Sequence, residues 1–170
     1  MCGIVGLFLK TDRLRPQLGD LLSDMLITMT DRGPDSAGLA IYGESEAYKL
    51  TIQSDHPAAV FPLVAAWLAE TGTGATLRAI DTHAVISMPL EQADTLTSSL
   101  NDKFEGIRVM GGGTSMEIFK EVGLPKDVAR RFAVREMAGT HGIGHTRMAT
   151  ESAVTTDGAH PFSTGSDQCL

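Results

Sequence analysis

Apolar and polar positions follow one another in blocks that predict a mixed α/β chain. The first apolar run covers residues 2–9, contains Gly3 and Gly6, and is typical of a buried strand approached closely by other backbone. Further on, apolar residues recur at helical spacing and predict a helix that packs one side on a sheet. These residues are Leu18, Leu21, Leu22, Met25, Leu26 and Met29.

A helix-breaking stretch at 31–36, which contains Gly33 and Pro34, ends this helix. Two short apolar runs follow at 38–42 and 47–53, and a turn at 43–45 separates them. The first third of the chain therefore reads as strand, helix, strand, strand.

The segment from about 56 to 132 has a different pattern of apolar residues. Strands are expected at 83–88 and 107–110, and apolar residues at spacing four within 91–104 predict a helix between them. This order indicates a βαβ-like unit, which we interpret as an α/β insertion within one domain of residues 1–170.

A run of three glycines, Gly111 to Gly113, precedes Thr114 and Ser115 between an expected strand and an expected helix. Successive backbone N–H groups in such a loop can form an anion-binding nest. A plain strand-to-helix connection explains the same pattern, because the spacing matches neither a Walker loop nor a dinucleotide fingerprint.

Composition narrows the class of protein. The 170 residues suit one domain, and the formal net charge of −7 argues against a nucleic-acid binder, which needs a basic face. No apolar stretch approaches the roughly 18 residues of a membrane span. The two distant cysteines form no disulfide framework and no metal-ligand cluster is visible, so a cytoplasmic protein without a metal is expected.

Cys2 stands one residue from the start of the chain. Removal of Met1 would leave a thiol and a free α-amine on one Cα, and an amine with a pKa of about 7.7–8.0 can accept the thiol proton at neutral pH. The cysteine would then act as a catalytic nucleophile. The alternative is a small apolar residue at a frayed end.

Two segments decide between these alternatives. Residues 31–39, Asp-Arg-Gly-Pro-Asp-Ser-Ala-Gly-Leu, and residues 142–150, Gly-Ile-Gly-His-Thr-Arg-Met-Ala-Thr, resemble signature segments of the class II glutamine amidotransferases, whose N-terminal cysteine cleaves the glutamine side-chain amide. Residues 150–162 resemble most the glutaminase-like subunit of N-methylglutamate synthase and glutamate-synthase-related systems.

The resemblance implies a set of substrate-binding residues. Arg147 would clamp the α-carboxylate of glutamine, and a guanidinium does bind carboxylate bidentately; the alternative is a surface ion pair. Met148, Thr150 and Glu151 would line the same pocket. Met148 stands where many members of the resembled family carry an aromatic residue, and Glu151 stands where several carry histidine. The details of substrate specificity in that family are therefore not transferred to this chain.

Four further residues are expected near this pocket. Arg32 and Asp35 would hold the N-terminal strand and the amine of Cys2, although a purely structural turn is the alternative for both. His145 and His160 are expected to be structural hydrogen-bonding residues and not the catalytic base, because the resembled family uses neither as a base.

The implied fold is the α/β/β/α sandwich of N-terminal-nucleophile amidohydrolases. In the family, the strand that corresponds to 167–170 continues into a His-Asn-Gly segment that supplies the oxyanion hole, and an aspartate that binds the substrate amine follows. The present sequence contains neither. We therefore expect the N-terminal part of a longer enzyme, with a sandwich that is incomplete at its C-terminal side.

The implied reaction is hydrolysis of L-glutamine to glutamate and ammonia through a thioester on Cys2. The ammonia would pass to synthase subunits of a glutamate-synthase-like complex. No cofactor is expected in this chain, and flavin and iron–sulfur centres would lie in partner subunits. The rivals are a non-catalytic regulatory or assembly subunit and an N-terminal-nucleophile amidohydrolase acting on another amide. The sequence leaves the ammonia acceptor and the oligomeric state open.

Overall fold

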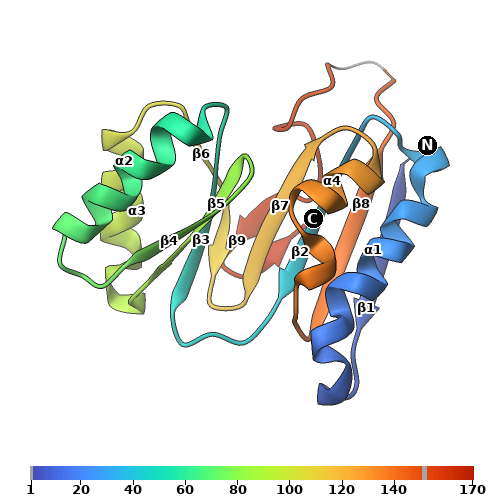
Figure 1. Cartoon of the computed structure of the whole chain (residues 1–170), viewed down its shortest axis with the longest axis horizontal. Coiled ribbons are helices and arrows are strands. Elements are labelled where there is room, and N and C mark those ends of the chain that lie inside the picture. The colour runs from blue at the N-terminus through green and yellow to red at the C-terminus, as the bar shows by residue number, and fades with distance from the viewer. Residues whose placement is uncertain (1, 151–152) are drawn as a thin grey trace.

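A computed structural model describes residues 2–150 and 153–170 as two four-stranded antiparallel sheets that lie side by side (Figure 1). The first sheet has the strand order β1-β8-β2-β7, and its strands are β1 (Gly3–Phe8), β8 (His141–Arg147), β2 (Ser36–Tyr42) and β7 (Met116–Val122). The strand predicted over residues 2–9 is confirmed as β1. The expectation of a buried strand is wrong, because β1 lies at the edge of the sheet and exposes Ile4 and Phe8 on one face.

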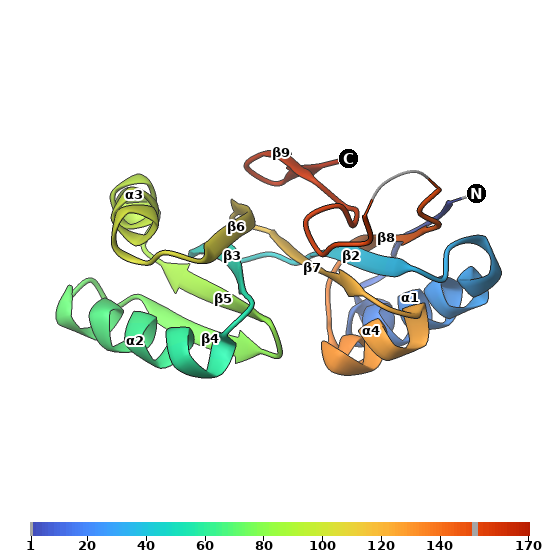
Figure 2. The same ribbon diagram turned by 90° about the horizontal axis from the view of Figure 1, so that it is seen from above.

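Two helices, α1 (Leu18–Thr28) and α4 (Pro125–Arg131), cover one face of this sheet, and Figure 2 shows both on the same side. The predicted stripe is confirmed at Leu22 and Leu26, which are buried in the core between helix and sheet. Leu21 is 37% exposed and lies outside the stripe. Helical periodicity therefore located the helix and most of its packing face.

The second sheet has the order β4-β5-β3-β6. It is formed by β3 (Tyr48–Ser54), β4 (Thr76–Ile80), β5 (His83–Met88) and β6 (Ile107–Gly113), with α2 (Pro57–Glu70) and α3 (Ala93–Lys103) between strands. Both β5 and β6 run antiparallel to β3, which lies between them, so the expected βαβ-like unit is a split βαβ. One face of the sheet and both helices share a core that contains Leu50, Ile52, Val64, Leu68, Ile86, Leu96 and Leu100.

The chain passes from one sheet to the other twice (Figures 1 and 2). The strands predicted on either side of the turn at 43–45 are confirmed as β2 and β3, but they belong to different sheets and do not pair. The segment 111–115 closes the second passage between β6 and β7, so the expected helix after it is wrong and a strand follows. Val85 of β5 packs with Phe119 and Phe132, which joins the two halves.

The segment 56–132 contributes strands to both sheets, because β7 within it pairs with β2. Its interpretation as an insertion stays a prediction. Short 3-10 helices occupy Asp12–Gln17, Thr30–Arg32, Leu90–Gln92 and Val134–Glu136.

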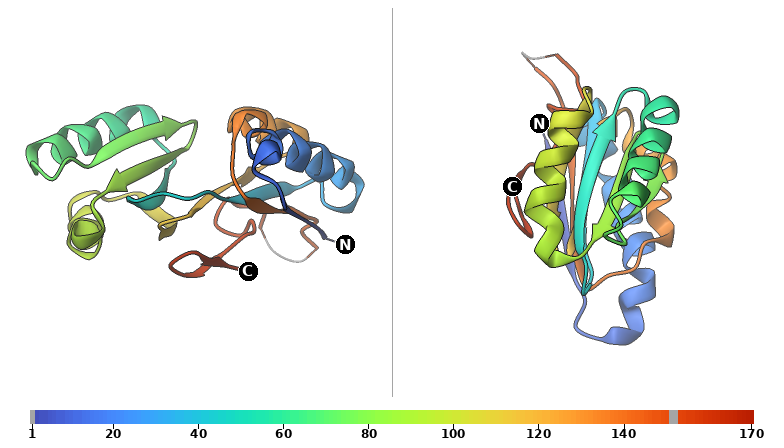
Figure 3. Two further views of the ribbon diagram at one scale, coloured as in Figure 1. Left: turned by 90° about the horizontal axis from the view of Figure 1, so that it is seen from below. Right: turned by 90° about the vertical axis from the view of Figure 1, so that its left-hand side faces the viewer.

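Residues 153–170, here called the strap, lie on the face of the first sheet opposite α1 and α4 (Figures 2 and 3). The strap ends in the two-stranded ribbon of β9 (Ser163–Gly165) and β10 (Gln168–Cys169). Cys169 packs beside Ala40, Met116 and Ile118 on that face. A mixed α/β fold with antiparallel sheets is thus confirmed, whereas the α/β/β/α sandwich stays a prediction.

None of the helices within the described ranges combines the length and apolar character that crossing a bilayer requires.

Candidate functional site

The register of the first sheet brings Cys2 and Arg147 to the same end of two neighbouring strands. Gly3 pairs with Thr146, so one further step sets Cys2 opposite Arg147. Val5 packs toward the core under α1, and strand alternation therefore directs Cys2 to the other face, together with Arg147. The thiol of Cys2 is exposed and forms no disulfide.

The strap passes directly over the side chain of Arg147. A Cβ added to Gly158 would lie 3.1 Å from Nη1 of Arg147, which is tighter than an ordinary contact, so the glycine favours this close approach. The arginine is half-buried as a result. A guanidinium partly shielded from water binds a carboxylate more strongly than one on the open surface.

Asp35 fixes the direction of the chain that leaves Arg147. The backbone N–H of Asp35 donates to the carbonyl of Arg147 at 3.1 Å, and its carboxylate accepts the N–H of Ala149 at 2.7 Å. Arg32 lies beside β1, with its Cβ 3.5 Å from where a Cβ on Gly3 would stand. Arg32 thus contacts the strand it was expected to hold, whereas Asp35 contacts the segment after Arg147.

The remaining predicted pocket residues follow Arg147 along the chain. Met148 is 36% exposed and Thr150 is exposed on a bend, so both are accessible to a ligand bound at Arg147. Glu151 lies outside the described residues.

His145 and His160 lie together on the same face of the sheet, with ring centroids 4.5 Å apart. Burial, the neighbouring His160 and the charge of Arg147 lower the pKa of His145 to about 4. Burial, Lys120 and Arg147 also lower the pKa of His160. Both imidazoles are therefore neutral at pH 7, and a base with a pKa near 4 takes up a thiol proton poorly.

Lys120 is a buried cation that sequence reasoning missed. It lies on β7, is 4% exposed, and donates through Nζ to the carbonyl of Ala159 at 2.8 Å. The same Nζ stands 4.2 Å from the ring centroid of Phe162. Alternation with Met116 and Ile118, which are buried on this face, was the signal that could have revealed it.

Asp167 was also missed, although its binding site was noticed. Its carboxylate accepts hydrogen bonds from the backbone N–H groups of Thr114, Ser115 and Met116 and from the hydroxyls of Thr114 and Ser115, at 2.7–3.2 Å. The glycine-rich segment is therefore an anion nest occupied by a residue of the same chain. Burial opposes ionisation, but these hydrogen bonds outweigh it and lower the pKa of Asp167 to about 2.

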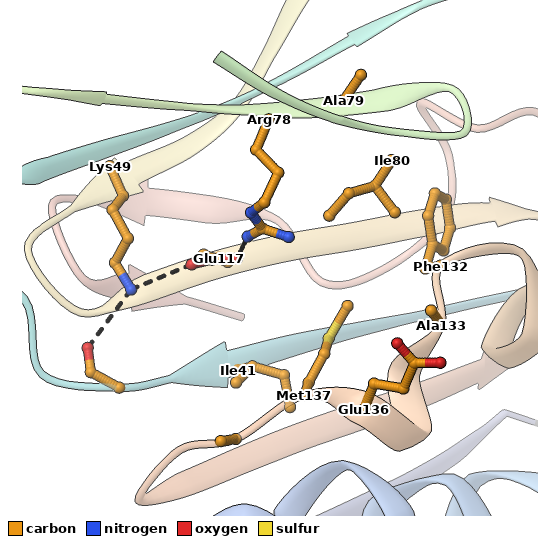
Figure 4. A pocket seen from close by; sticks show the side chains of 12 residues that line it. Ile41, Lys49, Arg78, Ala79, Ile80, Glu117, Phe132, Ala133, Glu136 and Met137 are labelled. Carbon is orange, nitrogen blue, oxygen red and sulfur yellow. Dashed lines mark hydrogen bonds and ion pairs between the residues drawn. The ribbon is translucent and has the colours of Figure 1, made fainter. Parts of the chain in front are cut away.

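A cavity of about 550 Å³ lies between the two sheets and is shown in Figure 4. Lys49 and Arg78 both donate to Glu117 in its wall, at 3.2 and 2.6 Å. Ile41, also in the wall, packs on the α1 side of the first sheet. The cavity is therefore on the side opposite Cys2, and it contains none of the residues predicted for the site.

Within residues 2–150 and 153–170, no group of three or more histidine, cysteine, aspartate or glutamate side chains is placed to hold a metal ion.

Comparison with known proteins adds an independent result. No family model matches the chain. Over 173 aligned positions, covering 100% of this chain and 57% of the relative, it is 63% identical to the "Glutamine amidotransferase-like protein GlxB" of Rhizobium meliloti. It is 33% identical to a "Putative glutamine amidotransferase" of Methanothermobacter thermautotrophicus, over 95% of this chain and 56% of that protein.

A shorter match covers 38% of this chain and 11% of the glutamine–fructose-6-phosphate aminotransferase (isomerizing) of Lactococcus lactis, at 41% identity. The chain spans about half the length of the first two relatives. Over its whole length, then, the chain is similar to proteins named as glutamine amidotransferases or as glutamine amidotransferase-like.

Proposed function

We propose that the natural protein is a class II glutamine amidotransferase that hydrolyses L-glutamine, with Cys2 as nucleophile after removal of Met1. The observation that carries this proposal is the shared sheet end and shared face of Cys2 and Arg147, which follows from the pairing of Gly3 with Thr146. The similarity to proteins named glutamine amidotransferase-like supports the same reaction.

In this reaction the α-amine of Cys2 takes the thiol proton, and the sulfur adds to the side-chain carbonyl carbon of glutamine. The carbon–nitrogen bond then breaks while the α-amine of Cys2 returns the proton to the leaving nitrogen. Ammonia departs, and the glutamyl group remains on Cys2 as a thioester. Water hydrolyses the thioester to glutamate and restores the thiol. The low pKa of His145 supports the amine as base, since an amine with a pKa near 8 is better matched to neutral pH.

Arg147 would bind the α-carboxylate of glutamine. Its position under the strap limits access of water, which strengthens a charge-assisted bidentate pair. Asp35 would support this clamp by fixing the carbonyl of Arg147 and the backbone that follows it.

Three finer points of the proposal rest on the resemblance of residues 150–162. The ammonia would pass to a cytoplasmic synthase of the N-methylglutamate or glutamate synthase type. Flavin and iron–sulfur centres would belong to partner subunits and not to this chain. The strap would begin the second sheet of an N-terminal-nucleophile sandwich, because it covers the face of the first sheet that the helices leave open.

The test is glutamate and ammonia release by the natural full-length protein, together with its intact mass. We expect a mass without Met1, loss of activity in Cys2→Ser, and retained activity in the matched variant Cys169→Ser. Cys169 is the other cysteine and contacts Tyr42 at 3.2 Å, away from the sheet end that holds Cys2. Full activity with Met1 retained would exclude the proposed mechanism, and a folded, inactive wild type would favour the non-catalytic alternative.

A further inference from the structure

The loop Thr114–Met116, here called the latch loop, holds the carboxylate of Asp167 more completely than a surface turn requires. Three consecutive backbone N–H groups and two hydroxyls donate to it. The N–H of Asp167 itself donates to the carbonyl of Gly112 at 2.9 Å. Hydrogen bonds to an ionised acceptor are stronger than neutral ones, so this is the best-defined attachment of the strap.

The backbone around the contact is shaped for it. Gly113 has φ +153, and a Cβ there would lie 2.1 Å from Oδ1 of Asp167. Asp167 has φ 58, a left-handed conformation that is uncommon outside glycine. Such conformations persist where the surroundings enforce them, and here the surroundings are the latch loop.

The contact decides where the end of the strap lies. Asp167 precedes β10, and the N–H of Leu170 donates to the carbonyl of Phe162 at 2.8 Å, which closes the ribbon. Leu170 then reaches a cavity of about 230 Å³ lined also by Ile4, His145 and His160. Ile4 is two residues from Cys2, so the ribbon ends beside the strand of the proposed nucleophile.

We propose that Asp167 is a positioning residue: by occupying the latch loop it holds the Phe162–Leu170 ribbon so that Leu170 lies near Ile4 on the strand of the proposed nucleophile. This role rests on the proposed glutamine hydrolysis.

Other attachments lie earlier in the strap, where Thr156 donates to Glu121 and Lys120 donates to the carbonyl of Ala159. Within the ribbon, Lys120 stands over the ring of Phe162, and the hydroxyl of Tyr42 contacts Sγ of Cys169. The earlier attachments hold the part that covers Arg147, whereas the latch supplies the charge-assisted hydrogen bonds that hold the ribbon. Loss of the latch therefore affects turnover more than substrate binding.

The experiment removes the contact from either side. Asp167→Gly deletes the carboxylate without opposing the left-handed backbone, and Gly113→Ala puts a methyl group where the carboxylate lies. Gly106→Ala is the matched control, because Gly106 also has a positive φ of +81 but has no atom within 4 Å of the added Cβ. Amide hydrogen exchange at Phe162 and Leu170 and the kinetics of the natural full-length protein are measured for each.

We expect exchange at Phe162 and Leu170 to accelerate about ten- to a hundred-fold in Asp167→Gly and Gly113→Ala. In both variants kcat falls about ten- to a hundred-fold and KM stays within about two-fold, as expected of a displaced active-site wall. The double variant matches either single one, since both break one contact. The control changes neither exchange nor kcat.

Unchanged exchange at Leu170 in Asp167→Gly would overturn the proposal, and so would an unchanged kcat. If the wild-type protein releases no ammonia from glutamine, the proposed function fails, whereas the latch is decided by the exchange rates alone. Asp167→Asn gives a second, isosteric variant should the glycine variant not fold. Its amide keeps one acceptor oxygen, removes the negative charge and turns an NH2 group toward N–H donors of the latch loop, so an acceleration in the same direction is expected.

Discussion

Lys120 makes the stability of this protein depend on pH in an unusual direction. Burial lowers its pKa from 10.5 to about 8, although the carboxylate of Asp157 opposes the change. The unfolded chain therefore binds the proton more tightly than the folded protein does. Protonated Lys120 destabilises the fold below pH 8, and the free energy of unfolding rises between pH 8 and 10.5.

The magnitude follows from the two pKa values. At about 1.36 kcal/mol per pH unit, the change from 10.5 to about 8 corresponds to roughly 3 kcal/mol. The side chain is only 4% exposed, so solvent screening reduces this value little. Replacement by methionine keeps the unbranched apolar stem and removes the charge, and such replacements of buried charges are often neutral or stabilising.

The assay is urea-induced unfolding of wild type and Lys120→Met at intervals from pH 7 to 10.5, followed by circular dichroism. Groups that titrate in both proteins cancel when the free energy of unfolding of the variant is subtracted from that of wild type. This difference should therefore rise by roughly 3 kcal/mol in favour of wild type across the pH range. The matched control is Lys103→Met, which removes a lysine charge at the exposed end of α3 and leaves the buried side chain of Lys120 in place. A difference for Lys120→Met that is independent of pH would refute the reasoning.

Three other outcomes are expected. Arg147→Lys should lower kcat/KM for glutamine through loss of a bidentate pair, by an amount that corresponds to on the order of 2–4 kcal/mol of activation free energy. The control Arg135→Lys, at an exposed ion pair, should leave kcat/KM unchanged. If kcat/KM is also unchanged in Arg147→Lys, Arg147 is a structural residue. In urea unfolding, Leu22→Ala should lower the free energy of unfolding by about 2–5 kcal/mol, and Leu21→Ala on the same helix by less than about 1 kcal/mol. Equal losses of stability in the two variants would contradict the assigned packing face of α1. Gly33→Ala should reduce both Tm and kcat/KM, because its Cβ would lie 2.5 Å from the backbone nitrogen of Arg147; a silent substitution would show that this turn can shift freely.

Much of the local structure could be predicted from the sequence. The spacing of Leu18, Leu22 and Leu26 is enough to locate α1 and its buried face, because the helical period is a local property. The strands β1, β2 and β3 were located by the same kind of pattern. Which strands pair is a different matter: β2 and β3 are neighbours in sequence and belong to different sheets. A two-residue alternation identifies a strand and carries no information about its partner.

The residues of the candidate site could also be predicted only in part. Cys2 and Arg147 were identified by their chemistry and by a family resemblance, and the register brings them to one end of the sheet. The latch could not be predicted, because Asp167 and Ser115 are 52 positions apart and neither residue type is unusual in a turn. Lys120 escaped notice for a physical reason, since a lysine in an alternating strand is ordinarily assigned to the solvated face.

The order in which the strands pair affects when the proposed nucleophile, Cys2, reaches its place during synthesis. The second sheet is built from one contiguous stretch, β3 to β6, and such local contacts form early. Among the described strands β1 pairs with β8 alone, and Gly3 must wait for Thr146 to leave the ribosome. Chains emerge from their N-terminal end, so β1 is made long before the strand with which it pairs. Until β8 forms, β1 has no partner strand, so Cys2 and Arg147, the proposed nucleophile and carboxylate clamp, reach one sheet end only late in synthesis.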